Sequence, residues 1–476
     1  MTRQLSPITS DRIDAEAAKV VRRLTRYDYE AYLVGGCVRD LLLGRSPKDF
    51  DVSTNATPTE IRKLFRNSRI IGRRFRLVHI FFGRKIIETA TFRAPPPQSD
   101  DEDDDLLIWR DNVFGSAEED ALRRDFTING LFYDLSAEQV IDTVGGLEDL
   151  RAGLVRTIGD PDIRFQEDPV RILRAIKFAT RLDMTIEPET LRALVAHRGL
   201  IARCSVARVL EEIYRLLSSG TARVAFELMH RTGVLAVLFP ELAALLPEPA
   251  DKNARTPVEP LTRSRRDAPS KGSDWDDDDE TSDDEESDGV GAGDDENGNS
   301  STVERLLAHL ELETPELRRA AGEALYAHLG ALDEMMLVAE EPLTHAVVLG
   351  ALVLPLLAHG FDPERRAGWL VERIDAVITA VATRIQVSRR DKERLRQILV
   401  AQRRMCVGRP RKQMVHRDYF REAYELLELR QHAGSAQEGA LDRWVEHAEP
   451  RKRRQRTSRA RGRRRRGARH STGENR

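Results

Sequence analysis

The sequence has few cysteines, few aromatic residues and no long apolar segment. Its three cysteines, among 476 residues, are too far apart to build a disulfide framework or a zinc site. A reducing, cytoplasmic compartment is the simplest interpretation. Aromatic residues make up only 6% of the chain, which disfavours a β-sandwich or β-barrel and favours helices. The longest apolar run, residues 346–358, contains Pro355 and is too short for a membrane span, so we expect a buried helix pair and no membrane association.

The net charge is also close to zero, but it is the sum of an acidic segment and a basic segment. The formal charge is −3, yet residues 273–297 hold 14 acidic residues and no basic one. Residues 451–469 hold 12 basic residues and no acidic one. A segregated basic tail of this kind predicts a polyanionic partner. The first 24 residues are mixed polar and charged, without the apolar segment of a secretory signal.

The pattern of apolar residues changes along the chain. After a leader that includes a helix over residues 12–26, strand-like runs alternate with helical stretches such as residues 57–65, which predicts an α/β domain. The strand-like runs are residues 31–34, 50–52, 77–82, 85–91 and 139–142. From residue 162 onward the apolar spacing is helical, with helices expected over residues 170–182, 187–195, 207–217, 222–235, 303–404, 416–430 and 441–448.

Two segments have too little apolar material to fold, namely an acidic insert over 247–302 and the basic tail over 450–476. The expected regions are therefore a leader (1–28), an α/β head (29–160), a helical neck (161–246), the acidic insert (247–302), a helical body and tail (303–449) and the basic tail (450–476).

Two aspartates alternate with apolar residues in the segment Lys48-Asp49-Phe50-Asp51-Val52. On a strand, side chains two residues apart point to one face, so Asp49 and Asp51 are expected to project together. Two crowded carboxylates need a cation between them, and a pair of Mg²⁺ ions suits an all-oxygen site for phosphoryl or nucleotidyl transfer. The alternative is a surface strand with two hydrated acids, because the pattern is common.

A glycine turn precedes this pair, in the segment Leu33-Val34-Gly35-Gly36-Cys37-Val38-Arg39-Asp40. Glycines between a strand and a helix let backbone N–H groups approach a phosphate, and Arg39 could bind the same anion. By itself this is only a tight turn. Placed shortly before the two aspartates, it predicts a phosphate cradle that faces a metal site.

Two further segments carry paired acids and arginines. Arg124 and Asp125 lie in Arg123-Arg124-Asp125-Phe126-Thr127-Ile128-Asn129, where Asp125 is a candidate third carboxylate. In Glu167-Asp168-Pro169-Val170-Arg171-Ile172-Leu173-Arg174, the three residues Asp168, Arg171 and Arg174 share one helix face and could meet the edge of a base. Ordinary ion pairs on a helix surface are the alternative for each segment.

Together, in this order, these segments resemble the class II nucleotidyltransferases, which comprise bacterial poly(A) polymerases and CCA-adding tRNA nucleotidyltransferases. The resemblance is dense over residues 29–238 and thinner to about residue 430. The segments Ile70–His79, Ile86–Arg93, Asn112–Ser116 and His416–Leu427, and the arginine-rich tail, look like the poly(A) polymerase branch. The insert over 247–302 departs from the family pattern.

The resemblance implies a nucleotidyltransferase head with a mixed sheet and flanking helices, followed by all-helical neck, body and tail regions. It implies template-independent transfer of AMP from ATP to RNA 3′ ends, as in RNA polyadenylation and mRNA processing, with two Mg²⁺ ions. Rival interpretations are a CCA-adding enzyme and, from another class, a non-catalytic RNA-binding protein.

The site residues follow from the same resemblance, motif by motif. Asp49 and Asp51 match the metal-binding catalytic pair, and Asp125 matches the third acidic position, with Glu88 as an alternative. Triphosphate contacts correspond to Gly36, Arg39 and Arg124. The base-reading pair corresponds to Asp168 and Arg171, and Arg174 to a further nucleotide contact. Some of Arg73, Arg74 and Arg76 are expected near incoming phosphate or RNA.

Overall fold

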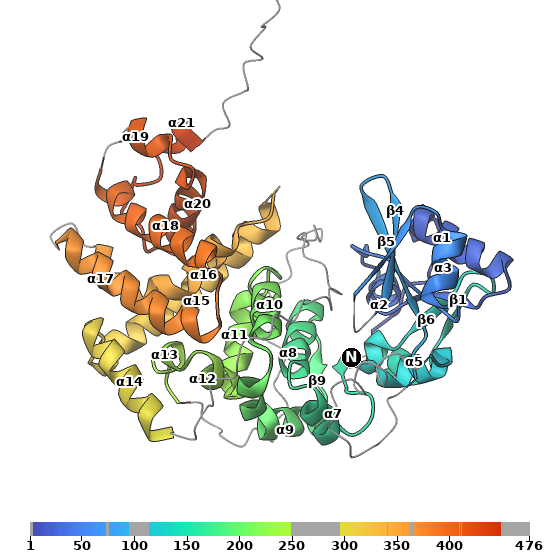
Figure 1. Ribbon diagram of the computed structural model, residues 1–476. Coiled ribbons are helices and arrows are strands. Elements are labelled where there is room, and N and C mark those ends of the chain that lie inside the picture. Colours follow the sequence, from blue (N-terminus) through green and yellow to red (C-terminus); the bar gives the residue numbers. More distant parts are fainter. Residues whose placement is uncertain are drawn as a thin grey trace, which may run out of the picture.

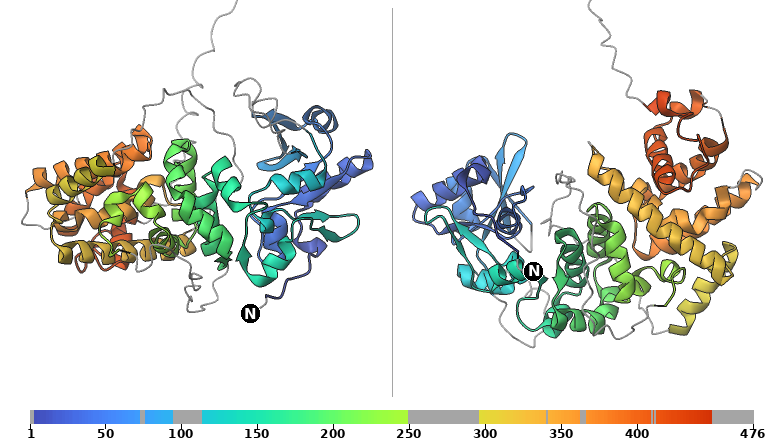
Figure 2. Two further views of the ribbon diagram at one scale, coloured as in Figure 1. Left: turned by 90° about the horizontal axis from the view of Figure 1, so that it is seen from below. Right: turned by 180° about the vertical axis from the view of Figure 1, so that it is seen from behind.

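The computed structural model describes residues 3–72, 76–94, 114–248, 296–339, 341–361, 366–408, 410 and 412–448. The chain forms an α/β head at one end, followed by helices that continue in an open arc away from it (Figure 1). Views from below and from behind show the same succession (Figure 2). The predicted fold class, a mixed-sheet head followed by helices, is confirmed. Over these ranges, no helix combines the length and the apolar character needed to cross a membrane.

The head is built on a seven-stranded mixed sheet with the order β3-β4-β5-β2-β1-β6-β7. Strands β2 and β5 run parallel, and the other neighbours are antiparallel. The strands are β1 (Ala31–Val34), β2 (Asp51–Thr54), β3 (Ser68–Ile71), β4 (Leu77–Phe82), β5 (Lys85–Thr91), β6 (Phe132–Asp134) and β7 (Gln139–Ile141). A separate pair joins β8 (Leu154–Val155) and β9 (Thr185–Ile186).

Three helices of the head begin at well-formed side-chain caps. Helix α1 starts after Asp14, whose carboxylate accepts hydrogen bonds from two backbone N–H groups, and α3 and α5 start with capping boxes at Thr57 and Ser116. The head contains η1 (Ser10–Arg12), α1 (Ala15–Arg26), α2 (Gly36–Leu42), α3 (Pro58–Leu64), α5 (Ala117–Arg123), η2 (Thr127–Asn129) and α6 (Gly146–Ala152).

The two faces of the sheet are covered differently. On one face, α1, α2 and α3 bury the apolar residues of the central strands in the main core. On the other face, Val34 of β1 and Phe132 of β6 pack with Phe92 and with Ala121 of α5, and Ile141 of β7 lies against this cluster. Over β4 and β5 this second face carries His79, Phe81, Ile86 and Glu88, and we refer to these four residues as the open half of the sheet. Among the described residues, the apolar cluster under α5 does not extend to this half.

The remainder of the described chain is helical and shares the main apolar core. The neck contains α7 (Pro161–Glu167), α8 (Arg171–Leu182), α9 (Pro188–His197), η3 (Arg198–Arg203), α10 (Val206–Leu217), α11 (Ala222–Arg231), α12 (Val234–Leu238) and α13 (Pro240–Ala243). The body contains α14 (Glu296–His309), α15 (Pro315–Val338), α16 (His345–Val353), η4 (Leu354–Phe361), α17 (Ala367–Val377), η5 (Ile378–Ala382), α18 (Arg389–Val407), α19 (Lys412–Val415), α20 (Phe420–His432) and α21 (Val445–Ala448).

Neck and body meet through apolar helices and one aromatic stack. The rings of Tyr214 on α10 and His345 on α16 lie parallel, with centroids 3.8 Å apart and an interplanar angle of 6°. His345 Nδ1 also lies 3.6 Å from a carboxylate oxygen of Asp391 on α18. The apolar run over 346–358 forms α16, which ends at Val353, and η4, which begins at Leu354, so the helix pair expected to break near Pro355 is observed.

Some boundaries differ from the expectations. The predicted helix over 222–235 is two helices, because Gly233 between them adopts φ +76°. Helix α14 begins at Glu296, inside the range predicted as the acidic insert. The rest of that insert from residue 249 onward, and the basic tail, lie outside the described residues.

Candidate active site

The register of the sheet brings Asp51 next to the glycine turn. Strand β1 pairs antiparallel with β2, and Asp51 lies directly opposite Val34, the residue before Gly35 and Gly36. Strand β2 begins at Asp51, one residue later than predicted, so Asp49 precedes the strand instead of lying on it. Asp49 is exposed and Asp51 is half-buried. The two acids therefore lie at the entrance of the strand that borders the turn.

Gly35 has the conformation that the turn needs. Its φ of +68° is unfavourable for other residues, and a Cβ there would lie 2.8 Å from Nη1 of Arg124. A Cβ at Gly36 would lie 3.6 Å from Nη2 of Arg39. The predicted phosphate contacts Gly36, Arg39 and Arg124 are thus grouped around one bend.

Glu88 shares a sheet face with Asp51. Val52 is opposite Thr89 in the parallel pair of β2 and β5, so the same register places Asp51 beside Glu88. Glu88 lies opposite His79 on β4, with 2.9 Å between Oε1 and the histidine Nε2. This placement puts Glu88, the alternative third acid, on the open half.

Asn129 connects the groups that the sequence analysis treated separately. Its Oδ1 accepts a hydrogen bond from Nη1 of Arg39 at 2.6 Å, and its Nδ2 donates to Oδ1 of Asp125 at 3.0 Å. Its backbone oxygen accepts from Nη1 of Arg124 at 3.4 Å. The sequence analysis gave Asn129 no role. Its position four residues after Asp125, in a turn of η2, was the one feature that could have indicated its role as a connecting residue.

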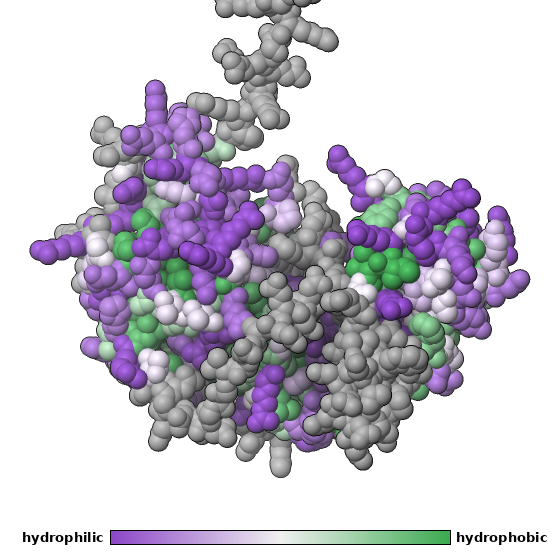
Figure 3. Space-filling model, viewed as in Figure 1, coloured by the Kyte–Doolittle hydropathy of each residue, from purple (hydrophilic) through white to green (hydrophobic). Residues whose placement is uncertain are grey.

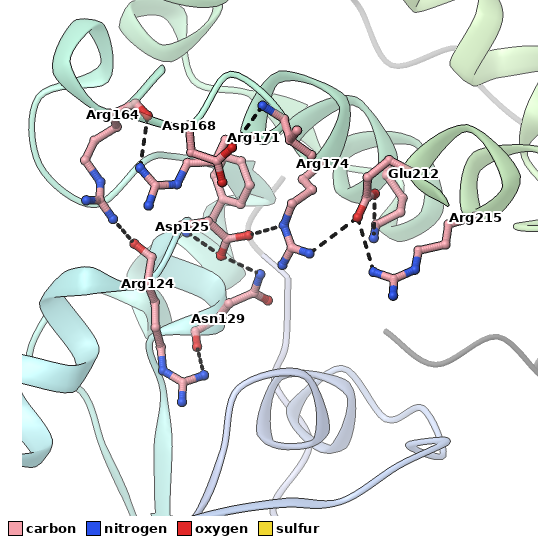
Figure 4. A network of polar contacts seen from close by, with 12 residues as sticks. Arg124, Asp125, Asn129, Arg164, Asp168, Arg171, Arg174, Glu212 and Arg215 are labelled. Carbon is pink, nitrogen blue, oxygen red and sulfur yellow. Dashed lines mark hydrogen bonds and ion pairs between the residues drawn. The ribbon is translucent and has the colours of Figure 1, made fainter. Parts of the chain in front are cut away.

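Asp125 is buried between head and neck, with both carboxylate oxygens engaged (Figure 4). Oδ1 also accepts from the backbone N–H of Phe126 at 2.7 Å, and Oδ2 accepts from Nε of Arg174 at 2.8 Å. Burial alone would raise the pKa of Asp125, but the charge of Arg174 and the hydrogen bonds from Asn129, Arg174 and Phe126 lower it to about 2. Asp125 is therefore a carboxylate that ties α8 to the head.

Arg174 continues into a buried charge cluster in the neck. Its Nη1 lies 3.5 Å from Oε1 of Glu212, which also pairs with Lys177 at 3.1 Å and Arg215 at 3.2 Å (Figure 4). Burial raises the pKa of Glu212, but the charges of Lys177, Arg174 and Arg215 outweigh it and lower the pKa. Glu212 lies 38 residues beyond Arg174, so no local motif revealed it.

Asp168 and Arg171 lie side by side at the start of α8, where Pro169 ends α7 (Figure 4). Oδ2 of Asp168 accepts from Nη2 of Arg208 at 2.8 Å. Nη1 of Arg171 donates to the backbone oxygen of Arg164 at 2.9 Å and to Glu167 at 3.0 Å. Arg171 and Arg174 thus have different partners, although they lie one turn apart on the helix.

Among the described residues, no group of three or more histidine, cysteine, aspartate or glutamate side chains forms a ready metal site. A site of one or two carboxylates completed by substrate phosphates is a common arrangement for Mg²⁺. Arg76 is exposed beside β4, whereas Arg73 and Arg74 lie outside the described residues.

Three family models match consecutive parts of the chain. The poly A polymerase head domain matches residues 31–156, and the probable RNA and SrmB-binding site of polymerase A matches residues 183–246. The polymerase A arginine-rich C-terminus matches residues 369–476. Together they cover more than half of the chain and follow the order of head, neck and body.

Curated relatives come from both branches of the family. Poly(A) polymerase I of Salmonella typhi is 47% identical over 255 residues, which are 52% of this chain and 55% of that protein. Poly(A) polymerase I of Escherichia coli O6:H1 is 44% identical over 268 residues, 55% of this chain and 58% of the relative. The CCA-adding enzyme of Geobacillus thermodenitrificans is 36% identical over 228 residues, 48% of this chain and 55% of the relative. The chain spans little more than half the length of these relatives.

A solved structure shares the fold. The Bacillus stearothermophilus CCA-adding enzyme in complex with CTP has a TM-score of 0.51 and 23% identity, covering 90% of this chain and 82% of that chain. The order of the three family models, the identity to curated relatives and this fold lead to one conclusion. The chain belongs to the nucleotidyltransferase family of bacterial poly(A) polymerases and CCA-adding enzymes.

Proposed function

We propose that this protein adds AMP from ATP to the 3′ ends of RNA without a template, and releases pyrophosphate. One observation carries the proposal, namely that Asp51 lies opposite Val34, beside the Gly35–Gly36 bend and on the sheet face that carries Glu88. The poly(A) polymerase branch is favoured over CCA addition because those relatives are 44–47% identical, against 36% for the CCA-adding enzymes.

The acids at the start of β2 fit divalent metal ions. Asp49 and Asp51 would hold Mg²⁺, with ATP phosphates completing the coordination, and we expect two ions as in other nucleotidyl transfers. Bound there, the metal would supply charge neutralisation for the phosphates and a lowered pKa for the primer 3′-hydroxyl. Glu88 lies on the same face and is the better-placed third acid of the two considered.

The arginines around the bend would bind and orient the triphosphate. Arg124 touches the glycine turn directly, while Arg39 is 1% exposed and held by Asp40 and Asn129. We therefore expect Arg39 to hold the Gly35–Gly36 bend rigid from its buried side. Its guanidinium would also place positive charge near the site where the leaving pyrophosphate gains negative charge. Asp125 would act through Arg174, which it positions at the entrance to the neck.

Selection of ATP would depend on the first turn of α8. Asp168 offers carboxylate oxygens and Arg171 offers guanidinium N–H groups, so the pair can accept from and donate to the edge of a base. Contacts from Arg208 and Glu167 fix their directions, which a base-reading pair requires. Arg174 would contact the nucleotide from the next turn.

RNA would be bound beyond the head. The family models match an RNA-binding region over residues 183–246 and an arginine-rich region over residues 369–476. Cationic groups that contact phosphates give an affinity that falls steeply with salt. The cytoplasmic location stays a prediction from the sequence.

A primer-extension assay tests the proposal. The protein is incubated with Mg²⁺, a short RNA of arbitrary sequence and each nucleoside triphosphate separately. Long homopolymer tails with ATP alone are the expected result. Addition of C, C and A restricted to tRNA would favour the CCA-adding alternative. RNA binding without any incorporation would favour a non-catalytic RNA-binding protein.

A further inference from the structure

The open half of the head sheet ends in an apolar pair at the tip of the β4–β5 hairpin. Phe81 and Ile86 lie directly opposite each other in the register of the two strands. Their exposed fractions are 36% and 44%, which is high for large apolar side chains within strands. Figure 3 shows a hydrophobic area on the head over these strands, bordered by hydrophilic side chains. The pair is therefore available to a ligand.

This apolar pair continues the row that carries the acids. Ile86 lies two residues from Glu88 on β5, and Phe81 lies two residues from His79 on β4, so all four point to one face. Two residues along a strand correspond to about 7 Å. Since Asp51 is beside Glu88 on the same face, the pair lies next to the proposed metal-binding acids and not on a separate surface.

Two exposed arginines flank the pair. Arg69 lies opposite His79 on β3, and Arg84 lies in the hairpin turn; both are exposed. Within the described part of the chain, neither arginine forms an ion pair. An aromatic ring flanked by unpaired cations beside a nucleotidyl-transfer site has the chemistry that binds a single-stranded nucleic acid, through stacking on bases and attraction of phosphates.

We infer that Phe81 and Ile86 form a stacking platform for a base near the 3′ end of the RNA primer. The inference rests on the proposed function and adds a primer contact on the head itself. The base adjoining the terminal nucleotide would lie over the Phe81 ring, with Ile86 against its edge, while Arg69 and Arg84 meet the backbone. The platform would hold the 3′-hydroxyl toward Asp51 and would leave the ATP pocket untouched.

The test compares Phe81→Leu, Phe81→Trp and Ile70→Ala in the full chain. Ile70 is a matched control, because it is 38% exposed on β3 but lies opposite the buried Val78, on the other sheet face. We expect Phe81→Leu to raise the KM for a short RNA primer at least about fivefold, since one base stack is lost. The KM for ATP and kcat should change less than about twofold. Phe81→Trp should restore the primer KM, and Ile70→Ala should match the unmodified protein.

Equilibrium binding of a fluorescent RNA decamer without ATP supplies a second readout. Phe81→Leu should weaken binding without changing the dependence on salt, because no charge is removed. If Phe81→Leu and Ile70→Ala bind RNA with equal affinity, the inference is overturned. The pair of Phe81 and Ile86 would then be a contact for a protein partner. Equal losses in the Leu and Trp variants would also overturn it. If the unmodified protein extends no RNA, the proposed function is refuted instead. The equilibrium binding assay still tests whether Phe81 contacts RNA, because it does not depend on extension.

Discussion

The open half of the head sheet and the junction between head and neck both carry acids, but they use them differently. At the sheet, Asp51 is half-buried and shares a sheet face with Glu88. At the junction, Asp125 and Glu212 are buried, and each faces arginine or lysine partners. In the first arrangement Asp51 lies at the entrance of a strand beside the glycine turn, and in the second the acids tie α8 to the head and α10 to α8. Acids that lie near the same motifs therefore have different surroundings, and we expect their substitutions to have different effects.

The largest expected effect comes from Asp51, which lies beside the open half of the sheet. Asp51→Asn should lower AMP incorporation by about 10³-fold, because charge stabilisation at the transferred phosphate is lost. The melting temperature should change by no more than about 2 °C, since Asp51 is only half-buried at the first position of its strand. Primer extension and thermal unfolding check both parts. Glu30→Gln, an exposed acid just before β1, is the control and should keep full activity. An Asp51→Asn protein with normal incorporation would contradict the site.

The opposite result is expected at the junction. Arg174→Met removes the partner of a buried carboxylate and should lower the free energy of unfolding by about 3 kcal/mol. Denaturant unfolding measures this. Arg192→Met is the matched control, because Arg192 pairs with Asp162 on the surface and its loss should cost less than about 1 kcal/mol. Equal losses of unfolding free energy in Arg174→Met and Arg192→Met would contradict the expected difference between a buried and an exposed ion pair.

The stability of the protein at acid pH should also depend on the buried pair of Asp125 and Arg174. Asp125 has a pKa of about 2 in the folded chain, below its ordinary value of 3.8. A depressed pKa gives stability that is fully present above about pH 4 and is lost as the pH falls toward 2. The difference in unfolding free energy between the unmodified protein and Asp125→Asn should therefore shrink by roughly 2 kcal/mol between pH 5 and pH 2. A constant difference across this window would show that Arg174 does not hold Asp125 ionised.

The smallest expected effect concerns nucleotide choice. Asp168→Asn should reduce the preference for ATP over CTP by about tenfold, because the pattern of acceptors at the base edge changes. The ratio of kcat/KM values for the two nucleotides measures it. Arg208→Met, which removes the group that orients Asp168, should give a smaller shift in the same direction. An unchanged ratio in both variants would exclude Asp168 from base reading.

Local patterns predicted the strands well where neighbouring residues decide the structure. The ranges expected for residues 31–34, 77–82 and 85–91 are those of β1, β4 and β5. A hairpin is specified by alternation on both sides of a short turn, here Gly83-Arg84, so its bounds can be read from the sequence. Strand β6 (Phe132–Asp134) was missed, because three residues are too few to show a period.

The junction could not be predicted, because its contacts join residues far apart in sequence. Asp125 meets Arg174 and Arg174 meets Glu212, and no spacing rule connects these positions. The motif suggested that Asp125 was a third catalytic acid, whereas its hydrogen bonds come from Phe126, Asn129 and Arg174. Its role in catalysis stays a proposal, now through Arg174. The helix face shared by Arg171 and Arg174 was foreseen, but their separate partners depend on α7 and α10.

The parallel rings of Tyr214 and His345 have a consequence for motion under the proposed function. A growing RNA end must shift by one nucleotide after every addition, so one joint of the molecule has to yield. The rings lie flat against each other with centroids 3.8 Å apart, and His345 also lies near Asp391 on α18, so this contact couples the neck to two helices of the body. We therefore expect neck and body to move together in that shift, with this contact intact.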